Sequence, residues 1–293
     1  MRKLFIFAFA ALGMLACTQR GQEDPEPEPE KVEGALPGKF SVSANTKVQF
    51  SQGNLQYQSS TNTWRLAEHQ WVTIANATSE KSTSESGWTD YITWETGAEY
   101  LPKDGDPVFI DWGSYAISNG GNTANMWRIL TADEWLYLFY DRTNAENLFA
   151  LGTVNDMPGV IILPDNWSKP SDIVFHSSAE KGYTWGHEFD LGGYLKAIGY
   201  SVQDQENHFL DNTYSTGEWL KMETAGAVFL PAAGNEWNGQ AYGVKSYGMY
   251  WSARPYTRDE ERESFSIFFY DTALIPQCPD ADDTKGQSVR LVH

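Results

Sequence analysis

Residues 248–293 read GMYWSARPYTRDEERESFSIFFYDTALIPQCPDADDTKGQSVRLVH, with apolar segments at both ends and an alternating segment between them. In the alternating segment, Phe265, Ile267 and Phe269 stand two residues apart. Because the side chains of a β-strand point alternately to its two faces, this spacing predicts a half-buried strand with these three residues on the core side. Trp251, in the apolar segment that opens the stretch, is expected in the core as well.

The opposite side of the same strand carries a mixture of aromatic, charged and small side chains, as do the loops that flank it. A rigid scaffold commonly uses such a mixture as a binding face, and aromatic residues beside arginine are typical of interface hot spots. The alternative is an ordinary solvated sheet face with scattered aromatic residues. We expect one contiguous exposed ligand-binding patch, formed by Arg254, Tyr256, Arg258, Asp259, Ser266, Phe268, Tyr270, Asp271, Thr272 and Ile275.

The composition indicates a globular chain. Its 293 residues are 41% hydrophobic and 14% aromatic, which is enough to bury a sizeable core in one large domain or two small ones. The formal net charge of -18 makes nucleic acid and anionic membrane surfaces poor partners. The same charge favours solubility.

The N-terminal residues 1–17 have the pattern of a signal peptide. Basic residues precede an apolar run at 4–12, which is too short to span a bilayer. The GMLAC segment that ends at Cys17 resembles a bacterial lipobox. Cleavage there would leave Cys17 as a lipidated N-terminus and place the protein on the outer membrane at the cell surface. Met14 is unusual at its position, so ordinary signal-peptide cleavage is the alternative.

An acidic, proline-rich linker is predicted over residues 18–38. Proline and glutamate alternate in it, which favours an extended, self-repelling spacer. We expect it to tether a folded domain at 39–293. Cys17 and Cys278 are the two cysteines of the chain. If Cys17 carries lipid, Cys278 is unpaired, and the domain is held together by its core and not by disulfides.

Two capping boxes predict helices. Thr131 with Glu134 opens a helix over 132–142, and Ser215 with Glu218 opens one that runs to about residue 225. Short apolar segments bounded by turn residues predict strands at 40–43, 47–50, 55–57, 63–66, 160–163 and 227–231. Two helices among many short strands, without a βαβ rhythm, indicate an α+β single domain.

Four short motifs occur in order along this domain. They are WRIL at 127–130 leading into Thr131 and Glu134-Trp135, FLPAAG at 229–234, GMYWS at 248–252 and GQSVRLV at 286–292. In this order they resemble the C-type-lectin-like domain of the formylglycine-generating-enzyme, or sulfatase-modifying-factor, type. In particular they are similar to surface lipoproteins that are variable proteins of diversity-generating retroelements. The resemblance covers residues 39–293.

The resemblance implies that the C-terminal strands and loops display the binding surface, with a variable region at about 249–286. It also implies a fixed frame, matched here by Tyr250, Trp251, Ser252, Ile267, Phe269, Leu274, Gly286, Ser288, Val289 and Arg290. The residues between the frame positions would face the ligand. The chain departs from the pattern at 258–263, where RDEERE stands in a region that is often rich in Asn and Ser.

Catalytic groups are not apparent. Enzymes of the resembling family oxidise a substrate cysteine with a pair of active-site cysteines, and Cys278 alone does not supply that pair. The five histidines form no zinc-like pair at helical spacing. Acidic residues at 280–283 could hold calcium, but they lack the ordered ligand spacing of a calcium loop. We therefore expect no enzymatic activity, no cofactor and no metal site.

The sequence thus favours a lipid-anchored, monomeric receptor or adhesin that binds a protein or glycan ligand on another cell or on a phage. Two other functions stay open. One is an enzyme of the sulfatase-modifying type, and the other is a subunit or tip of a surface filament such as a pilus.

Overall fold

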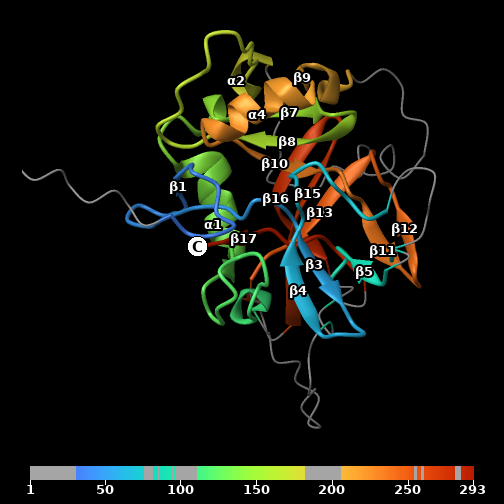
Figure 1. Ribbon diagram of the computed structural model, residues 1–293. Helices are drawn as coiled ribbons and strands as arrows, with labels where there is room; N and C mark the ends of the chain where they lie inside the picture. Colours follow the sequence, from blue (N-terminus) through green and yellow to red (C-terminus); the bar gives the residue numbers. More distant parts are fainter. Residues whose placement is uncertain are drawn as a thin grey trace, which may run out of the picture. The chain divides into compact units, whose positions relative to one another are not determined.

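The computed structural model describes residues 31–75, 82–84, 86–93, 96, 111–181, 206–253, 256–258, 261–280 and 285–293. For 256–258, 261–264 and 279–280 it describes the backbone alone. Val32–His293 form one compact unit. This unit is a mixed α+β structure, made mostly of strands with a few short helices, as Figure 1 shows. The predicted signal peptide and Cys17 lie outside the described residues.

The strands form small, mostly antiparallel sheets. A four-stranded sheet has the order β10 (Val228–Pro231), β8 (Met157–Ile162), β7 (Phe149–Val154) and β9 (Thr213–Tyr214), with β7 and β9 parallel. The C-terminal sheet contains β13 (Tyr247–Trp251), β15 (Glu261–Tyr270), β14 (Tyr256–Arg258) and β16 (Ala273–Asp280). β4 (Thr63–Leu66), β3 (Leu55–Gln58) and β5 (Trp88–Thr89) form a third sheet. Three strand pairs join β1 (Phe40–Ser41) to β2 (Lys47–Val48), β11 (Asn235–Trp237) to β12 (Gln240–Tyr242), and β17 (Leu291–Val292) to β6 (Arg128–Ile129).

Both capping boxes are formed, and both predicted helices are confirmed. The Thr131 hydroxyl accepts from the Glu134 N–H, and α1 (Ala132–Leu136) continues as a π-helical turn, η2 (Tyr137–Asp141). Ser215 and Glu218 cap α4 (Thr216–Thr224) in the same way. The shorter helices are η1 (Trp112–Ser114), η3 (Ala145–Asn147), α2 (Ser178–Lys181) and η4 (His208–Leu210).

The β10–β8–β7 sheet separates two parts of the core. One face carries Leu151, Val160 and Leu230, which pack with α1 and with the C-terminal sheet in the main apolar cluster. The other face packs against Trp219 and Met222 of α4, which runs along this sheet at the top of Figure 1. Burial of both faces explains why β8 is a continuous apolar run and not an alternating one.

The predicted linker ends earlier than residue 38. Leu36 is 5% exposed and belongs to the main core cluster, and its N–H donates to the Phe50 carbonyl at 2.8 Å. Gly34 turns the chain with a φ of 79°. The folded unit begins at Val32, so the last residues of the predicted linker, Leu36 among them, belong to the folded domain.

Candidate ligand-binding surface

The core side of the C-terminal sheet is as predicted for two of the three alternating residues of β15, whereas Phe265 is half-buried and joins no core cluster. Ile267 and Phe269 are fully buried in the main cluster, and Trp251 is fully buried in a second cluster with Trp112 and Trp127. The Trp251 indole N–H donates to the Ile92 carbonyl at 2.6 Å. These contacts tie β13 to a segment that lies far away in the sequence.

The opposite side of the sheet is not exposed, so the expected patch is wrong for four of its members. Ser266 and Tyr270 are 0% exposed, Phe268 is 1% exposed and Ile275 is 2% exposed. Phe268, Tyr270 and Ile275 belong to one buried apolar cluster, together with Tyr247, Met249, Ala273 and Cys278. The alternation along β15 is real, but the sheet is covered on both faces. Phe268 and Tyr270, which were expected to point outward, pack in a second buried apolar layer on the opposite face of the sheet.

Side-chain contacts account for this burial. The rings of Phe268 and Tyr270 lie 5.4 Å apart between centroids, and the rings of Tyr247 and Phe268 lie 5.7 Å apart. Ser266 is small and polar, and its hydroxyl donates to the Gln287 side-chain oxygen at 2.6 Å. These residues therefore help to hold the sheet together and cannot contact a ligand from solution.

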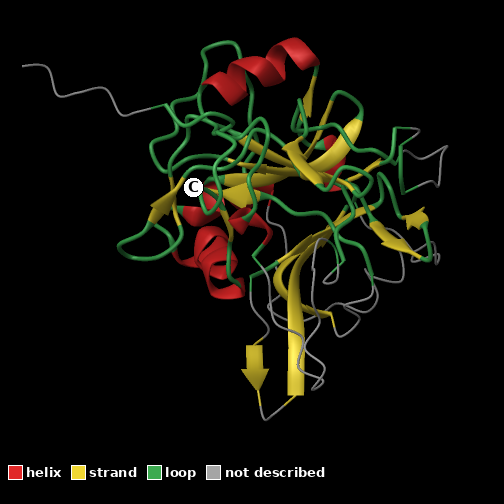
Figure 2. Cartoon of the chain, turned by 60° about the horizontal axis from the view of Figure 1, so that its bottom comes forward, coloured by secondary structure: helices red, strands yellow, loops and turns green. Residues whose placement is uncertain are grey.

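The remaining predicted residues do not gather into one patch. Asp271 and Thr272 are half-buried in the turn between β15 and β16, and the Asp271 carbonyl accepts from the His208 N–H at 2.9 Å. Tyr256 and Arg258 lie in β14, whose backbone pairs with the far end of β15. Tyr256 is paired with Glu263, seven positions before Tyr270, which corresponds to about 23 Å along the strand. Figure 2 shows β14 and this end of β15 extending together at the bottom of the view. Arg254 and Asp259 lie outside the described residues, as do Asp282 and Asp283 of the acidic stretch at 280–283.

A buried polar centre anchors the C-terminal frame. Arg290 is 0% exposed and donates to the Asn54 side-chain oxygen at 3.1 Å, the Ser51 carbonyl at 3.1 Å and the Phe229 carbonyl at 2.8 Å. Burial lowers the pKa of Arg290 to about 10. The same Asn54 donates to the Tyr250 hydroxyl at 3.1 Å, which in turn donates to the Pro231 carbonyl at 3.0 Å. This network is closed to solvent, so it is a structural element and not a binding site.

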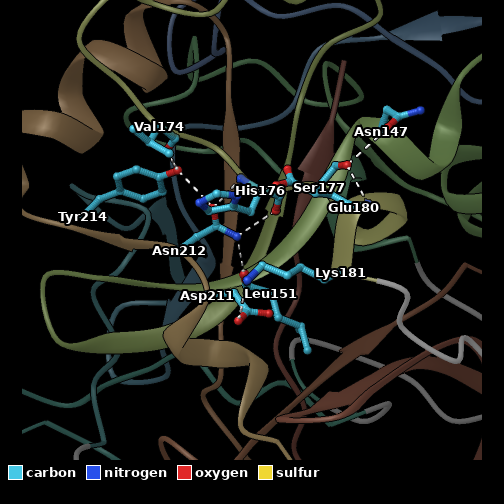
Figure 3. A network of polar contacts seen from close by, with 10 residues as sticks. All are labelled: Asn147, Leu151, Val174, His176, Ser177, Glu180, Lys181, Asp211, Asn212 and Tyr214. Carbon is cyan, nitrogen blue, oxygen red and sulfur yellow. Dashed lines mark hydrogen bonds and ion pairs between the residues drawn. The ribbon is translucent and has the colours of Figure 1, made fainter.

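A second polar network fastens the segment before α2 to β7 and β9, as Figure 3 shows. The Asn212 amide group donates to the carbonyls of Leu151 and His176, and its oxygen accepts from the His176 N–H. The Tyr214 hydroxyl donates to the Val174 carbonyl at 2.6 Å. Most of these bonds involve main-chain atoms, which is typical of a network that fixes a loop and not of a catalytic centre.

The titratable groups beside that network contact one another in an ion pair and two histidine–carboxylate contacts. Nδ1 of His208 lies 2.9 Å from Asp211, whose other oxygen is 3.2 Å from Lys181 Nζ. Nδ1 of His176 lies 2.8 Å from Glu180. Among the described residues, no group of three or more His, Cys, Asp or Glu side chains could hold a metal ion.

The β11–β12 hairpin carries exposed aromatic side chains that the sequence reasoning passed over. Trp237 is 50% exposed and Tyr242 is 42% exposed. A signal was present in the segment NEWNGQAY, because an Asn-Gly turn between short β-like segments predicts a two-residue hairpin. Asn238 and Gly239 do adopt positive φ angles of 53° and 80°.

Comparisons of the chain with protein-family models, with curated proteins and with solved structures found no match. Among the residues that the structure describes, no helix has the length and apolar character needed to cross a membrane.

Proposed function

We propose that this chain is a cell-surface lipoprotein whose C-type-lectin-like domain, of the formylglycine-generating-enzyme type, binds a protein or glycan ligand and does not convert it. The observation that carries the proposal is the burial of the C-terminal frame. Tyr250, Ile267 and Arg290 are 0% exposed, and the other frame positions are also buried. Because the frame residues are packed in the protein interior, they can hold a rigid scaffold. This supports the proposal that the domain displays ligand-binding loops.

The burial also limits which residues can contact the ligand in this proposal. Arg254, Tyr256, Arg258 and Asp259 stand in the sequence between β13 and β15, and they stay in the proposed contact surface. Diversification by a retroelement is proposed for the same segment. A reverse-transcriptase gene beside this one, with a near-identical template repeat for part of residues 249–286, would support it. A neighbouring region without such a repeat would contradict it.

Anchoring is tested by expressing the full chain in a Gram-negative host. We expect wild-type protein in the membrane fraction with labelled fatty acid attached, and Cys17→Ala protein released in soluble form. Wild-type protein without the label, together with a Cys17→Ala variant that stays in the membrane, would contradict the lipoprotein proposal.

The absence of catalysis is tested with a cysteine-containing sulfatase peptide. Cys278 is buried, and the part of the chain that the structure describes contains no second cysteine that could form a reactive pair with it. We expect the peptide mass to stay unchanged after incubation with the full chain. Conversion of its cysteine to formylglycine would establish the enzymatic alternative.

A further inference from the structure

The β11–β12 hairpin presents the exposed aromatic side chains of the described structure. The other large hydrophobic residues that are exposed there, Val174, Leu210 and Leu220, are aliphatic. Trp237 and Tyr242 leave 50% and 42% of their surface in water. Aromatic residues of this size bury most of their surface in ordinary packing, so two of them on one short hairpin call for a functional explanation.

The strand register places both rings on one face of the hairpin. Trp237 pairs with Gln240, and Asn235 pairs with Tyr242. Because paired residues and residues two apart share a face, Trp237, Gln240 and Tyr242 lie on the same side. Trp237 and Tyr242 are then diagonal neighbours, about 7 Å apart. Ala241 points to the other side and packs with Ala75 and Tyr91.

The hairpin is held in place before any ligand arrives. Glu236 exchanges two backbone hydrogen bonds with Gly286, at 2.7 and 3.0 Å. The Glu236 carboxylate accepts from the Gly239 N–H, and the Ser82 hydroxyl donates to the Gly239 carbonyl at 3.0 Å. Figure 1 shows the hairpin beside β5 at the right of the view. A fixed platform loses little conformational entropy on binding.

The exposed part of this face is apolar and uncharged, with one amide group. Asn235 shares the face but is 8% exposed, and its side-chain oxygen accepts from the Tyr247 hydroxyl. The Gln240 side-chain oxygen accepts from the Tyr242 hydroxyl at 3.1 Å. Gln240 is exposed, and its NH₂ group is the donor that this side chain can offer a ligand. The Glu236 carboxylate belongs to the opposite side of the hairpin. Aromatic rings beside an amide donor match a neutral sugar, whose C–H face stacks on the rings while its hydroxyl groups take the hydrogen bond.

The size of the face separates a sugar from a protein partner. Trp237 and Tyr242 together expose roughly 200 Å², whereas a stable protein interface buries about 800 Å² on each side. An anionic polymer is disfavoured because the chain carries a net charge of -18. We propose that Trp237, Gln240 and Tyr242 form a stacking subsite for a neutral glycan. This site is distinct from the loops between β13 and β15, and the proposal does not depend on lipidation or on a retroelement.

The test is affinity electrophoresis of the full chain in native gels that contain laminarin, mannan, galactomannan or starch, with heparin as an anionic control. We expect retardation by at least one of the neutral polysaccharides and none by heparin. Trp237→Ala and Tyr242→Ala should each weaken the retardation at least tenfold, whereas Trp237→Phe should keep part of it. Leu210→Ala, at a residue that is 70% exposed, is the matched control and should migrate as wild type.

Thermal melting shows whether the variants fold, and we expect unchanged midpoints because both side chains are exposed. Titration of the retarding polysaccharide should quench tryptophan fluorescence in the wild type and not in Trp237→Phe. No retardation by any of the four neutral polysaccharides overturns the proposal, and so does retardation that the folded double variant Trp237→Ala/Tyr242→Ala retains. Retardation in heparin gels alone also overturns it, as does a change of mobility that self-association of the chain alone explains. None of these results bears on Cys17 or on the template repeat, so this inference and the proposed function fail separately.

Discussion

Replacing Arg290 with methionine tests the buried polar centre on which the C-terminal frame depends. The side chain is completely buried and touches no carboxylate among its hydrogen-bond partners. Its charge is stabilised instead by oxygens of Ser51 and Asn54 in one segment and of Phe229 in β10. The Gln70 side-chain oxygen also accepts from it at 3.4 Å, but that oxygen keeps the Phe229 N–H as a second donor. Methionine has a similar length and removes both the charge and the donors.

Two opposing effects determine how much Arg290→Met changes the free energy of unfolding. Each buried acceptor that loses its donor costs about 2 kcal/mol. Against this, the variant no longer buries a charge. Burial lowers the pKa of Arg290 well below its ordinary value, to about 10, which corresponds to about 3 kcal/mol regained on its removal. Three acceptors outweigh that gain, and we expect Arg290→Met to lower the free energy of unfolding by about 3 kcal/mol.

Urea denaturation of the purified chain measures this change. Arg128→Met is the matched control, because the Arg128 side chain is 37% exposed and pairs with Glu134 near the surface. It should cost about 1 kcal/mol or less. If Arg290→Met unfolds within about 1 kcal/mol of the wild type, or costs no more than Arg128→Met, the buried hydrogen bonds do not anchor the frame as argued.

Three other predictions concern stability. Trp251→Ala should cost about 3–5 kcal/mol in urea denaturation because the ring is fully buried, and unfolding at wild-type urea concentrations would contradict its place in the core. Phe268→Ser should destabilise the fold by a similar amount instead of leaving it intact, so a stable Phe268→Ser variant would restore the exposed-patch hypothesis. Burial raises the pKa of Asp90 from 3.8 to about 6, and its Oδ1 has no hydrogen-bond partner. The folded state therefore keeps this proton longer than the unfolded state. The free energy of unfolding should fall by about 3 kcal/mol between pH 3 and 7, about 2 kcal/mol of it between pH 4 and 6. Asp90→Asn should remove that part of the slope, whereas an unchanged slope would assign it to other groups.

Local signals predicted the local structure well. Thr131 with Glu134 and Ser215 with Glu218 are complete capping boxes within four residues, so no distant contact was needed to place α1 and α4. The β3–β4 hairpin also followed from its turn residues. β7 was missed, although the Asn155-Asp156 turn that joins it to β8 was visible in the sequence. Both residues adopt positive φ angles, 48° and 62°, as that kind of hairpin turn requires.

The candidate site was harder to predict because periodicity says which residues share a face and not whether that face is covered. Phe268 and Ile275 were placed correctly on one side of the sheet, where they are directly paired. The sequence left open whether their apolar character meant a hot spot or a second buried layer. The presence of Tyr247 and Met249 on the neighbouring β13 decides for the buried layer. Trp237 shows the opposite case. Its residue type favours burial, but its position on the β11–β12 hairpin leaves the side chain exposed.

This distinction constrains how the C-terminal region could vary in a diversified family of such proteins. A substitution at Phe268, Tyr270 or Ile275 would have to preserve a packed apolar layer, and random changes there would cost several kcal/mol each. Free variation is compatible only with positions outside this layer, at the β14 end of the sheet and at the Asp271-Thr272 turn. These ends are separated by about 23 Å along β15, so a small ligand bound at one end does not reach the other. A diversified ligand surface in this chain is therefore expected on the segment between β13 and β15, and not on the faces of the C-terminal sheet.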